Sequence, residues 1–290
     1  MYSLTVNAPA KVNLFLEVVR KRADGYHDIE SVFHELELED RLCFRRREDE
    51  ELRLVCDAED LATDGTNLVL RAARLLKEKT GCRLGADIAL QKRIPMNAGL
   101  GGGSSDAAAV FKALNALWDL DLTVSELGAL GTEIGSDVPF FLYGGTCLCR
   151  GRGDLVEPLA FAPVLELVLV FPEWGISTGR AYAALEGGET GARTPNPFLS
   201  ALRKGDLPGI ASQMFNRFEE AVFRMEPRQE ALYRALSALD FLAVRMTGSG
   251  STFFGLVGEG NDPEALVRQA RSCAGVIDAL STRSGRPSTA

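Results

Sequence analysis

The chain has 290 residues, of which 46% are hydrophobic, so it can form one large domain or two with a sizeable core. Its formal net charge of -8 at pH 7 argues against an extended nucleic-acid surface. The six cysteines show no C-x-x-C pairing and only two histidines are present, which argues against structural zinc and favours reduced thiols in a cytoplasmic protein. No apolar run approaches the length of a membrane span, so we expect no membrane partner.

The first third of the chain predicts strands interrupted by one helix. A lysine, Lys11, starts the second strand, where lysine is usually a solvated guard against edge pairing. The turn at residues 22–27 ends in Tyr26 and His27, which fit either a half-buried ring or stacking on a flat ligand. The basic run 45–47 is followed by four acidic residues and indicates a solvated hairpin tip. The predicted strands are 4–8, 12–18, 33–44, 52–55 and 86–90, and the helix is 67–79.

A glycine-rich stretch, PMNAGLGGGSSD at residues 95–106, follows the last of these strands. Four glycines in positions 99–103 free the backbone, so main-chain N–H groups can converge on a ligand. Apolar spacings of three and four predict a helix through residue 118, with Ser104, Ser105 and Asp106 as N-cap and first-turn residues. A helix N-terminus favours anions, so we predict a phosphate loop in preference to a plain packing joint.

The known phosphate loops fit this stretch poorly. No lysine follows the glycines, as the Walker A pattern requires. A dinucleotide fingerprint almost fits, but the loop does not directly follow its strand and its helix leads to another helix. The signatures of protein kinases are also missing.

The second half of the chain predicts further helices and strands. After a helix at 122–134, Asp137 precedes an apolar stretch expected to be a strand, and it is either a turn or cap residue or a catalytic one. Residues 157–163 suggest a boundary between domains 1–158 and 159–282. A small-residue loop, 247–251, joins two strands. We expect helices at 178–185, 198–202, 210–223, 226–239 and 263–273, strands at 146–150, 164–171, 243–246, 252–257 and 276–280, a mobile loop at 187–197 and a disordered tail at 283–290.

Three segments in this order resemble the signature motifs of the GHMP kinase superfamily: APAKVNL at 8–14, the loop at 95–105 and MTGSGST at 246–252. The superfamily comprises small-molecule kinases such as galactokinase, homoserine kinase and mevalonate kinase. RADGYH at 22–27 and GSDVPFF at 135–141 look like the branch that phosphorylates a CDP-linked methylerythritol in non-mevalonate isoprenoid synthesis. The resemblance implies a two-lobed α+β fold, with a mixed sheet and a phosphate loop over a helix in the N-terminal lobe and an α/β sandwich-like C-terminal lobe.

The same resemblance implies ATP-dependent, Mg2+-assisted phosphorylation of a tertiary hydroxyl. It makes Lys11 and Asp137 the catalytic pair, and it makes Tyr26 and His27 the residues that hold the cytosine. Further substrate contacts would be Asn13, Thr178 and Tyr182. The ATP phosphates would lie on Pro95, Met96, Asn97, Ala98, Gly99, Leu100, Gly101, Gly102, Gly103, Ser104 and Ser105.

Some points stay open in this interpretation. Ser104 or Ser105 could hold Mg2+ or could only cap the helix, and the metal ligands are otherwise unassigned. Asn97 departs from the Gly or Ala usual in the family, and Tyr182 can be Phe. We expect a monomer or weak homodimer. The alternatives are another GHMP kinase of homoserine or mevalonate type, or a non-catalytic nucleotide-binding protein on the same scaffold. A serine hydrolase is the least favoured alternative.

Overall fold

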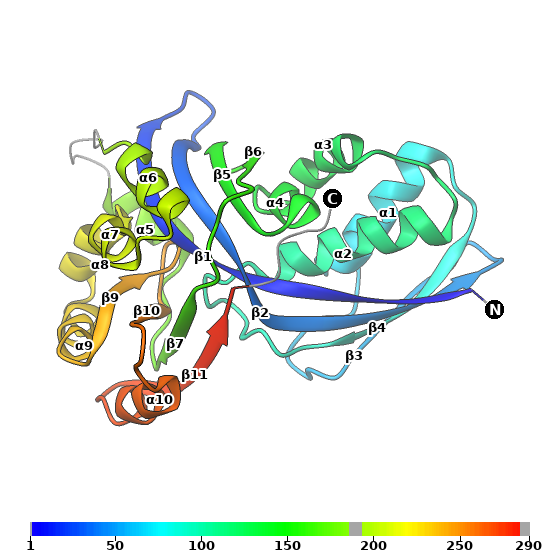
Figure 1. The fold of residues 1–290 in the computed structure, drawn as a ribbon. Coiled ribbons are helices and arrows are strands. Elements are labelled where there is room, and N and C mark those ends of the chain that lie inside the picture. Colours follow the sequence, from blue (N-terminus) through cyan, green and yellow to red (C-terminus); the bar gives the residue numbers. More distant parts are fainter. Residues whose placement is uncertain (1, 186–192, 285–290) are drawn as a thin grey trace.

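The computed structural model describes residues 2–185 and 193–284, and it contains two sheets covered by helices (Figure 1). The first sheet has the strand order β3-β4-β2-β1-β8, with β5 paired to β2 and β6 to β5. The second sheet has the order β11-β7-β10-β9. The first sheet is mixed, because β3–β4 and β1–β8 are parallel and the other pairs are antiparallel. The predicted two-lobed α+β fold is therefore confirmed.

The strands of the first sheet centre on a long antiparallel pair, β1 and β2. The two strands predicted at 4–8 and 12–18 form one continuous strand, with a register shift between Pro9 and Lys11. Ala10, Val12 and Leu14 pack in one apolar cluster, so the alternation of the strand turns Lys11 and Asn13 to the opposite face. The strands are β1 (Ser3–Lys21), β2 (His27–Arg47), β3 (Leu52–Cys56), β4 (Gly85–Gln91), β5 (Thr146–Gly151), β6 (Leu155–Pro158) and β8 (Phe215–Asn216).

Four helices cover one face of this sheet: α1 (Leu68–Thr80), α2 (Gly102–Leu117), α3 (Val124–Ile134) and α4 (Val138–Tyr143) (Figure 1). The side chain of Asn67 caps α1, and Gly81 ends the helix in the left-handed region. A run of buried alanines lets α2 lie close to α1 and β1. The apolar residues after Asp137, expected to be a strand, form α4 instead, packed against α2 and α3, and Pro139 is compatible with the first turn of this helix.

The second sheet contains β7 (Glu166–Pro172), β9 (Phe241–Met246), β10 (Phe253–Val257) and β11 (Val276–Arg283). With the exception of β8, strands before residue 158 lie in the first sheet and later ones in the second. Arg283 belongs to β11 and Ser284 is buried, so the expected disordered tail is wrong for these two residues. Residues 285–290 of that tail, and 187–192 of the expected mobile loop, lie outside the described residues.

The helices that follow β7 are α5 (Thr178–Ala184), α6 (Asn196–Lys204), α7 (Leu207–Gln213), α8 (Phe218–Met225), α9 (Pro227–Ser237) and α10 (Pro263–Arg271). The single helix predicted at 210–223 is wrong, because Phe215 and Asn216 leave the helix and form β8. These two residues pair in parallel with Phe15 and Leu16 of β1, so a contact distant in sequence overrides the local helical pattern.

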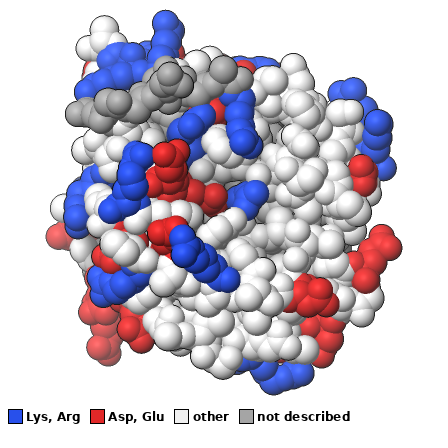
Figure 2. Space-filling model, turned by 90° about the vertical axis from the view of Figure 1, so that its left-hand side faces the viewer, with Lys and Arg blue, Asp and Glu red and all other residues white. Residues whose placement is uncertain are grey.

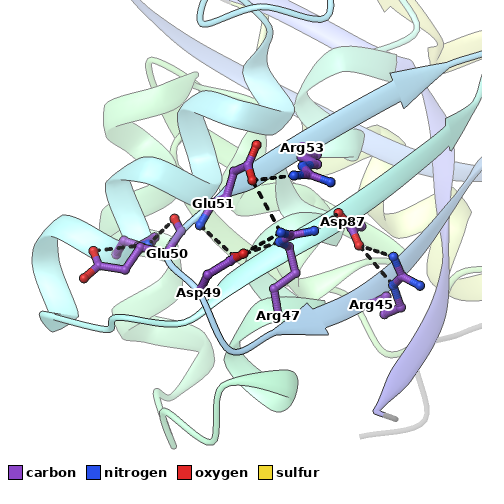
Figure 3. Close-up of polar contacts among 8 residues, drawn as sticks. Arg45, Arg47, Asp49, Glu50, Glu51, Arg53 and Asp87 are labelled. Atoms are coloured by element: carbon purple, nitrogen blue, oxygen red, sulfur yellow. Dashed lines mark hydrogen bonds and ion pairs between the residues drawn. The ribbon is translucent and has the colours of Figure 1, made fainter.

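The charged segment after β2 is a solvated turn, but not the tip of a hairpin. Strand β4 lies between β2 and β3, so the turn joins two strands that are not paired with each other. Figure 3 shows Arg47 contacting Asp49 and Glu51, and Arg45 contacting Asp87 of β4. The acidic neighbours therefore neutralise the basic run locally.

The face drawn in Figure 2 carries basic and acidic side chains interspersed among uncharged ones. Among residues 2–185 and 193–284, no helix combines the length and apolar character needed to cross a membrane.

Candidate active site

Lys11 is covered on both sides of β1, because β2 pairs with it on one side and the backbone oxygen of Leu100, in the glycine loop, accepts a hydrogen bond from its backbone N–H at 3.0 Å on the other. Its side chain is only 5% exposed, and its Nζ lies 3.8 Å from Oδ2 of Asp137. The ammonium donates hydrogen bonds to Oδ1 of Asn13 at 2.8 Å and to the backbone oxygen of Gly99 at 2.9 Å. Burial lowers the pKa of Lys11, and the nearby Asp137 carboxylate opposes part of that shift. The alternative of a solvated edge lysine is therefore wrong.

Asp137 occupies the N-cap position of α4, but its side chain makes no capping hydrogen bond. A capping carboxylate would accept a hydrogen bond from a first-turn N–H group, so the structure gives this residue no cap role. Its side chain is 32% exposed and lines a cavity together with Lys11. The carboxylate is thus free to meet a ligand.

The glycine loop leads into α2, which begins at Gly102 with Gly101 as its N-cap. Ser104 and Ser105 lie inside the first turn, so the expectation that they supply the N-cap is wrong. No side chain caps the helix, and its first N–H groups need acceptors from water or a ligand. Asn97 has φ 56°, a left-handed conformation that asparagine tolerates, which explains how it can stand in place of glycine.

Two glycines of the loop are required by close packing as well as by conformation. Gly99 and Gly101 both have φ 74°. A Cβ atom on Gly99 would lie 2.9 Å from the backbone oxygen of Thr247. A Cβ atom on Gly101 would lie 2.7 Å from the ring of Phe141 and 3.2 Å from Cγ of Lys11. The glycine loop therefore packs closely against both Lys11 and the second small-residue loop.

That second loop, at 247–251, completes the wall of the site. The hydroxyl of Thr247 donates a hydrogen bond to Oδ1 of Asn13 at 3.2 Å. The hydroxyl of Ser249 lies 3.1 Å from that of Thr178. The three segments with family-like motifs, distant in sequence, meet around Lys11.

Two cavities join at this point. The first, of about 540 Å³, is lined by Lys11, Asn13 and Asp137 and extends to Tyr26 and His27. The second, of about 620 Å³, follows the glycine loop from residue 95 to 104 and also contacts residues 60–62 and 66–68. Gly99, Gly101 and Thr178 line both cavities. A ligand in each would meet its neighbour beside Lys11 and Asp137.

The far end of the first cavity is aromatic. His27 stacks on Tyr182, with ring centroids 4.7 Å apart, and Tyr182 meets Phe218 edge to face. Tyr26 is exposed, and the guanidinium of Arg152 lies 4.9 Å from the centre of its ring. Burial, together with the charge of Asp137, raises the pKa of Tyr182 to about 12, so its hydroxyl stays protonated. Flat apolar walls next to a cation suit an aromatic ligand that carries negative charge.

The residues predicted for the site line the two cavities, except Ser105, which is buried and lines neither. Other lining residues were not predicted. Arg152 and Phe218 line the first cavity, and Lys92 and Asn67 line the second. None of these residues stands in a recognisable motif, and only the folded chain places them at the site.

Few oxygen atoms of the chain near the glycine loop are placed to bind Mg2+. The described residues hold no group of three or more His, Cys, Asp or Glu side chains that could bind a metal. Ser104 lines the second cavity, while the Ser105 hydroxyl is buried without a hydrogen-bond partner. Asp106 also lines the second cavity; its Oδ1 is buried without a hydrogen-bond partner, and its Oδ2 pairs with Nζ of Lys92 at 2.9 Å. The carboxylate of Asp106 and the hydroxyl of Ser104 suit a Mg2+ ion that takes its remaining ligands from phosphates and water.

Comparison with known families gives two matches. Residues 67–145 match the GHMP kinases N terminal domain, and residues 198–275 match the GHMP kinases C terminal domain. A 4-diphosphocytidyl-2-C-methyl-D-erythritol kinase of Pelotomaculum thermopropionicum is 43% identical over 257 residues, 88% of this chain and 90% of the relative. The enzyme of the same name from Shouchella clausii is 41% identical over 253 residues, 87% of this chain and 85% of the relative.

Solved structures agree with these matches. A crystal structure of 4-(cytidine 5'-diphospho)-2C-methyl-D-erythritol kinase aligns with a TM-score of 0.82 at 37% identity, covering 98% of this chain and all of the other. Homoserine kinase from Cytophaga hutchinsonii aligns with a TM-score of 0.75 at 19% identity, covering 98% of this chain and 94% of that one, and shows the shared fold.

Proposed function

This chain belongs to the GHMP kinase family, among the 4-diphosphocytidyl-2-C-methyl-D-erythritol kinases, and we propose that it uses ATP to phosphorylate the 2-hydroxyl of 4-diphosphocytidyl-2-C-methyl-D-erythritol in the non-mevalonate isoprenoid pathway. One observation carries the proposal: a cavity with an uncapped helix N-terminus joins a cavity with an aromatic end, and the Lys11–Asp137 pair lies at the junction. Phosphoryl transfer requires this meeting of donor and acceptor.

The catalytic pair has complementary tasks. Asp137 orients the acceptor hydroxyl and takes its proton as the bond to phosphorus forms. Lys11, whose Nζ lies 3.8 Å from that carboxylate, stabilises the negative charge that grows on the alcohol oxygen. The loop from Pro95 to Ser105 holds the phosphates of ATP on its amides.

The substrate lies in the first cavity. Tyr26, His27 and Tyr182 hold the cytosine by stacking and hydrogen bonding, and Arg152 offers a guanidinium to the diphosphate. Asn13 and Thr178, closer to the catalytic pair, contact the methylerythritol part.

Mg2+, when bound with ATP, neutralises charge on the phosphate oxygens. Ser104 and Asp106 are the residues of this chain that would hold it, because both line the loop cavity.

The monomeric or weakly dimeric state and the cytoplasmic location also stay predictions.

The test is incubation with ATP and the CDP-linked alcohol, followed by phosphorus NMR. A new phosphomonoester resonance, growing as ATP turns into ADP, supports the proposal. Homoserine and mevalonate, offered in parallel, test the other GHMP kinase activities, and phosphorylation of either in preference to the CDP-linked alcohol would contradict the proposal. Binding of ATP without turnover of any alcohol would favour a non-catalytic nucleotide-binding protein.

A further inference from the structure

One buried side chain, Asn216 of β8, is hydrogen-bonded to the backbone of the second small-residue loop, at 247–251, and of the residue before it. Its amide nitrogen donates hydrogen bonds to the backbone oxygens of Met246, at 2.6 Å, and of Gly248, at 2.8 Å. These two peptides lie on either side of Thr247. The amide oxygen of Asn216 accepts from the backbone N–H of Phe218 at 2.9 Å. Both ends of the amide are therefore engaged, which fixes its orientation.

The front of the same loop contacts the catalytic machinery. The Thr247 hydroxyl donates to Oδ1 of Asn13 and accepts from the Asn13 N–H, each at 3.2 Å. The same Oδ1 accepts a hydrogen bond from Nζ of Lys11. A Cβ atom built on Gly248 would lie 3.7 Å from Nζ of Lys11 and 3.5 Å from the backbone oxygen of Gly99. Gly248, which Asn216 bonds directly, and Thr247, which lies between the two carbonyl groups that Asn216 bonds, thus form the wall beside Lys11.

The backbone of Asn216 supplies a second connection to the site. It pairs with Leu16 of β1, and β1 also carries Lys11 and Asn13. One residue therefore anchors both the catalytic strand and the loop that faces it. Asn216 is 2% exposed, touches neither cavity and does not form part of the Lys11–Asp137 pair.

We propose that Asn216 is a positioning residue for phosphoryl transfer, acting through Thr247 and Gly248 on Asn13 and Lys11. The inference rests on the proposed kinase function for its kinetic effect. A purely structural role would lower stability alone. A positioning role lowers turnover, because small displacements of catalytic groups cost more in rate than in binding.

The deciding variant is Asn216→Asp, which keeps the size of the side chain but presents a carboxylate to two carbonyl oxygens. We expect kcat for the CDP-linked alcohol to fall about tenfold or more, with KM for both substrates changed less than about twofold. Reductive methylation of Lys11 by formaldehyde, followed by mass spectrometry, should become at least about twofold faster as the lysine loses its fixed partners. Asn115→Asp is the matched control. Asn115 also bonds backbone groups, those of Leu122, but lies outside the two cavities, so neither kcat nor Lys11 labelling should change.

A folded Asn216→Asp protein with unchanged kcat and unchanged Lys11 labelling would overturn the proposal. If this variant does not fold, Thr247→Val decides, since it removes the hydroxyl that links the loop to Asn13. A tenfold fall in kcat supports the positioning role, and a kcat equal to that of the wild type refutes it. Should the wild-type chain transfer no phosphate, the proposed function fails, while Lys11 labelling in the two variants still decides the positioning inference.

Discussion

Replacing Gly101 with alanine tests whether the glycine loop is shaped by its conformation and by its contact with Lys11. Gly101 has φ 74°, where an L-residue other than glycine costs about 1–2 kcal/mol. The new methyl group would lie 2.7 Å from the Phe141 ring, and such overpacking adds about 1–3 kcal/mol. If the loop keeps its shape, the free energy of unfolding should fall by about 2–5 kcal/mol.

The loop can instead relax, and the loss then appears in the kinetics. The same methyl group would lie 3.2 Å from Cγ of Lys11, so relaxation displaces the lysine. A displacement of about 1 Å at a catalytic group can cost about 10^2-fold in rate. Urea unfolding, together with kcat and KM for ATP, measures both outcomes.

Gly128→Ala is the matched control for this experiment. Gly128 lies inside α3, and a Cβ atom there would have nothing within 4 Å. Alanine in a helix interior should stabilise the protein by about 1 kcal/mol, with unchanged kinetics. A Gly101→Ala protein with wild-type stability and wild-type kcat would refute the reasoning about the loop.

Three further changes test other parts of the site and the fold. Asp137→Asn should lower kcat by about 10^2-fold or more with little change in KM, and steady-state kinetics showing an unaltered kcat would exclude Asp137 as the base. His27→Ala removes the ring stacked on Tyr182, so KM for the CDP-linked alcohol should rise by about 2- to 10-fold while kcat changes little, and an unchanged KM would remove His27 from the base site. Burial lowers the pKa of His34 to about 4, so the unfolded chain takes up a proton below about pH 6.5 that the folded one refuses. The free energy of unfolding should therefore fall by up to about 3 kcal/mol between pH 6.5 and 4. Urea unfolding of His34→Gln, repeated across this pH range, should show a weaker dependence of the unfolding free energy on pH than the wild type. An equal pH dependence in the two proteins would contradict this assignment.

The failures of sequence interpretation have a common origin. Residues 210–223 carry a helical pattern, but Phe215 and Asn216 pair with β1, about 200 positions earlier. The apolar run 138–143 fits a buried strand or a buried helix equally well, and packing against α2 and α3 selects the helix. Lys11 resembles an edge lysine in sequence, yet the glycine loop covers that edge of β1, where Leu100 accepts a hydrogen bond from the backbone N–H of Lys11. Periodicity reports local preference and carries no information about which distant segment will cover a face.

The sequence by itself determined the elements whose signals are local. The glycine loop with its helix, the helix α1 and most of the strands follow from backbone freedom and apolar spacing within a few residues. Only the tertiary structure decided that Lys11, Asp137 and the loop at 247–251 meet, and that Asn216 braces them. Lys11 lies more than a hundred residues from Asp137 and from the loop at 247–251, and Asn216 lies about 30 residues before the loop that it bonds. These contacts form because two sheets and their helices bury their apolar faces together.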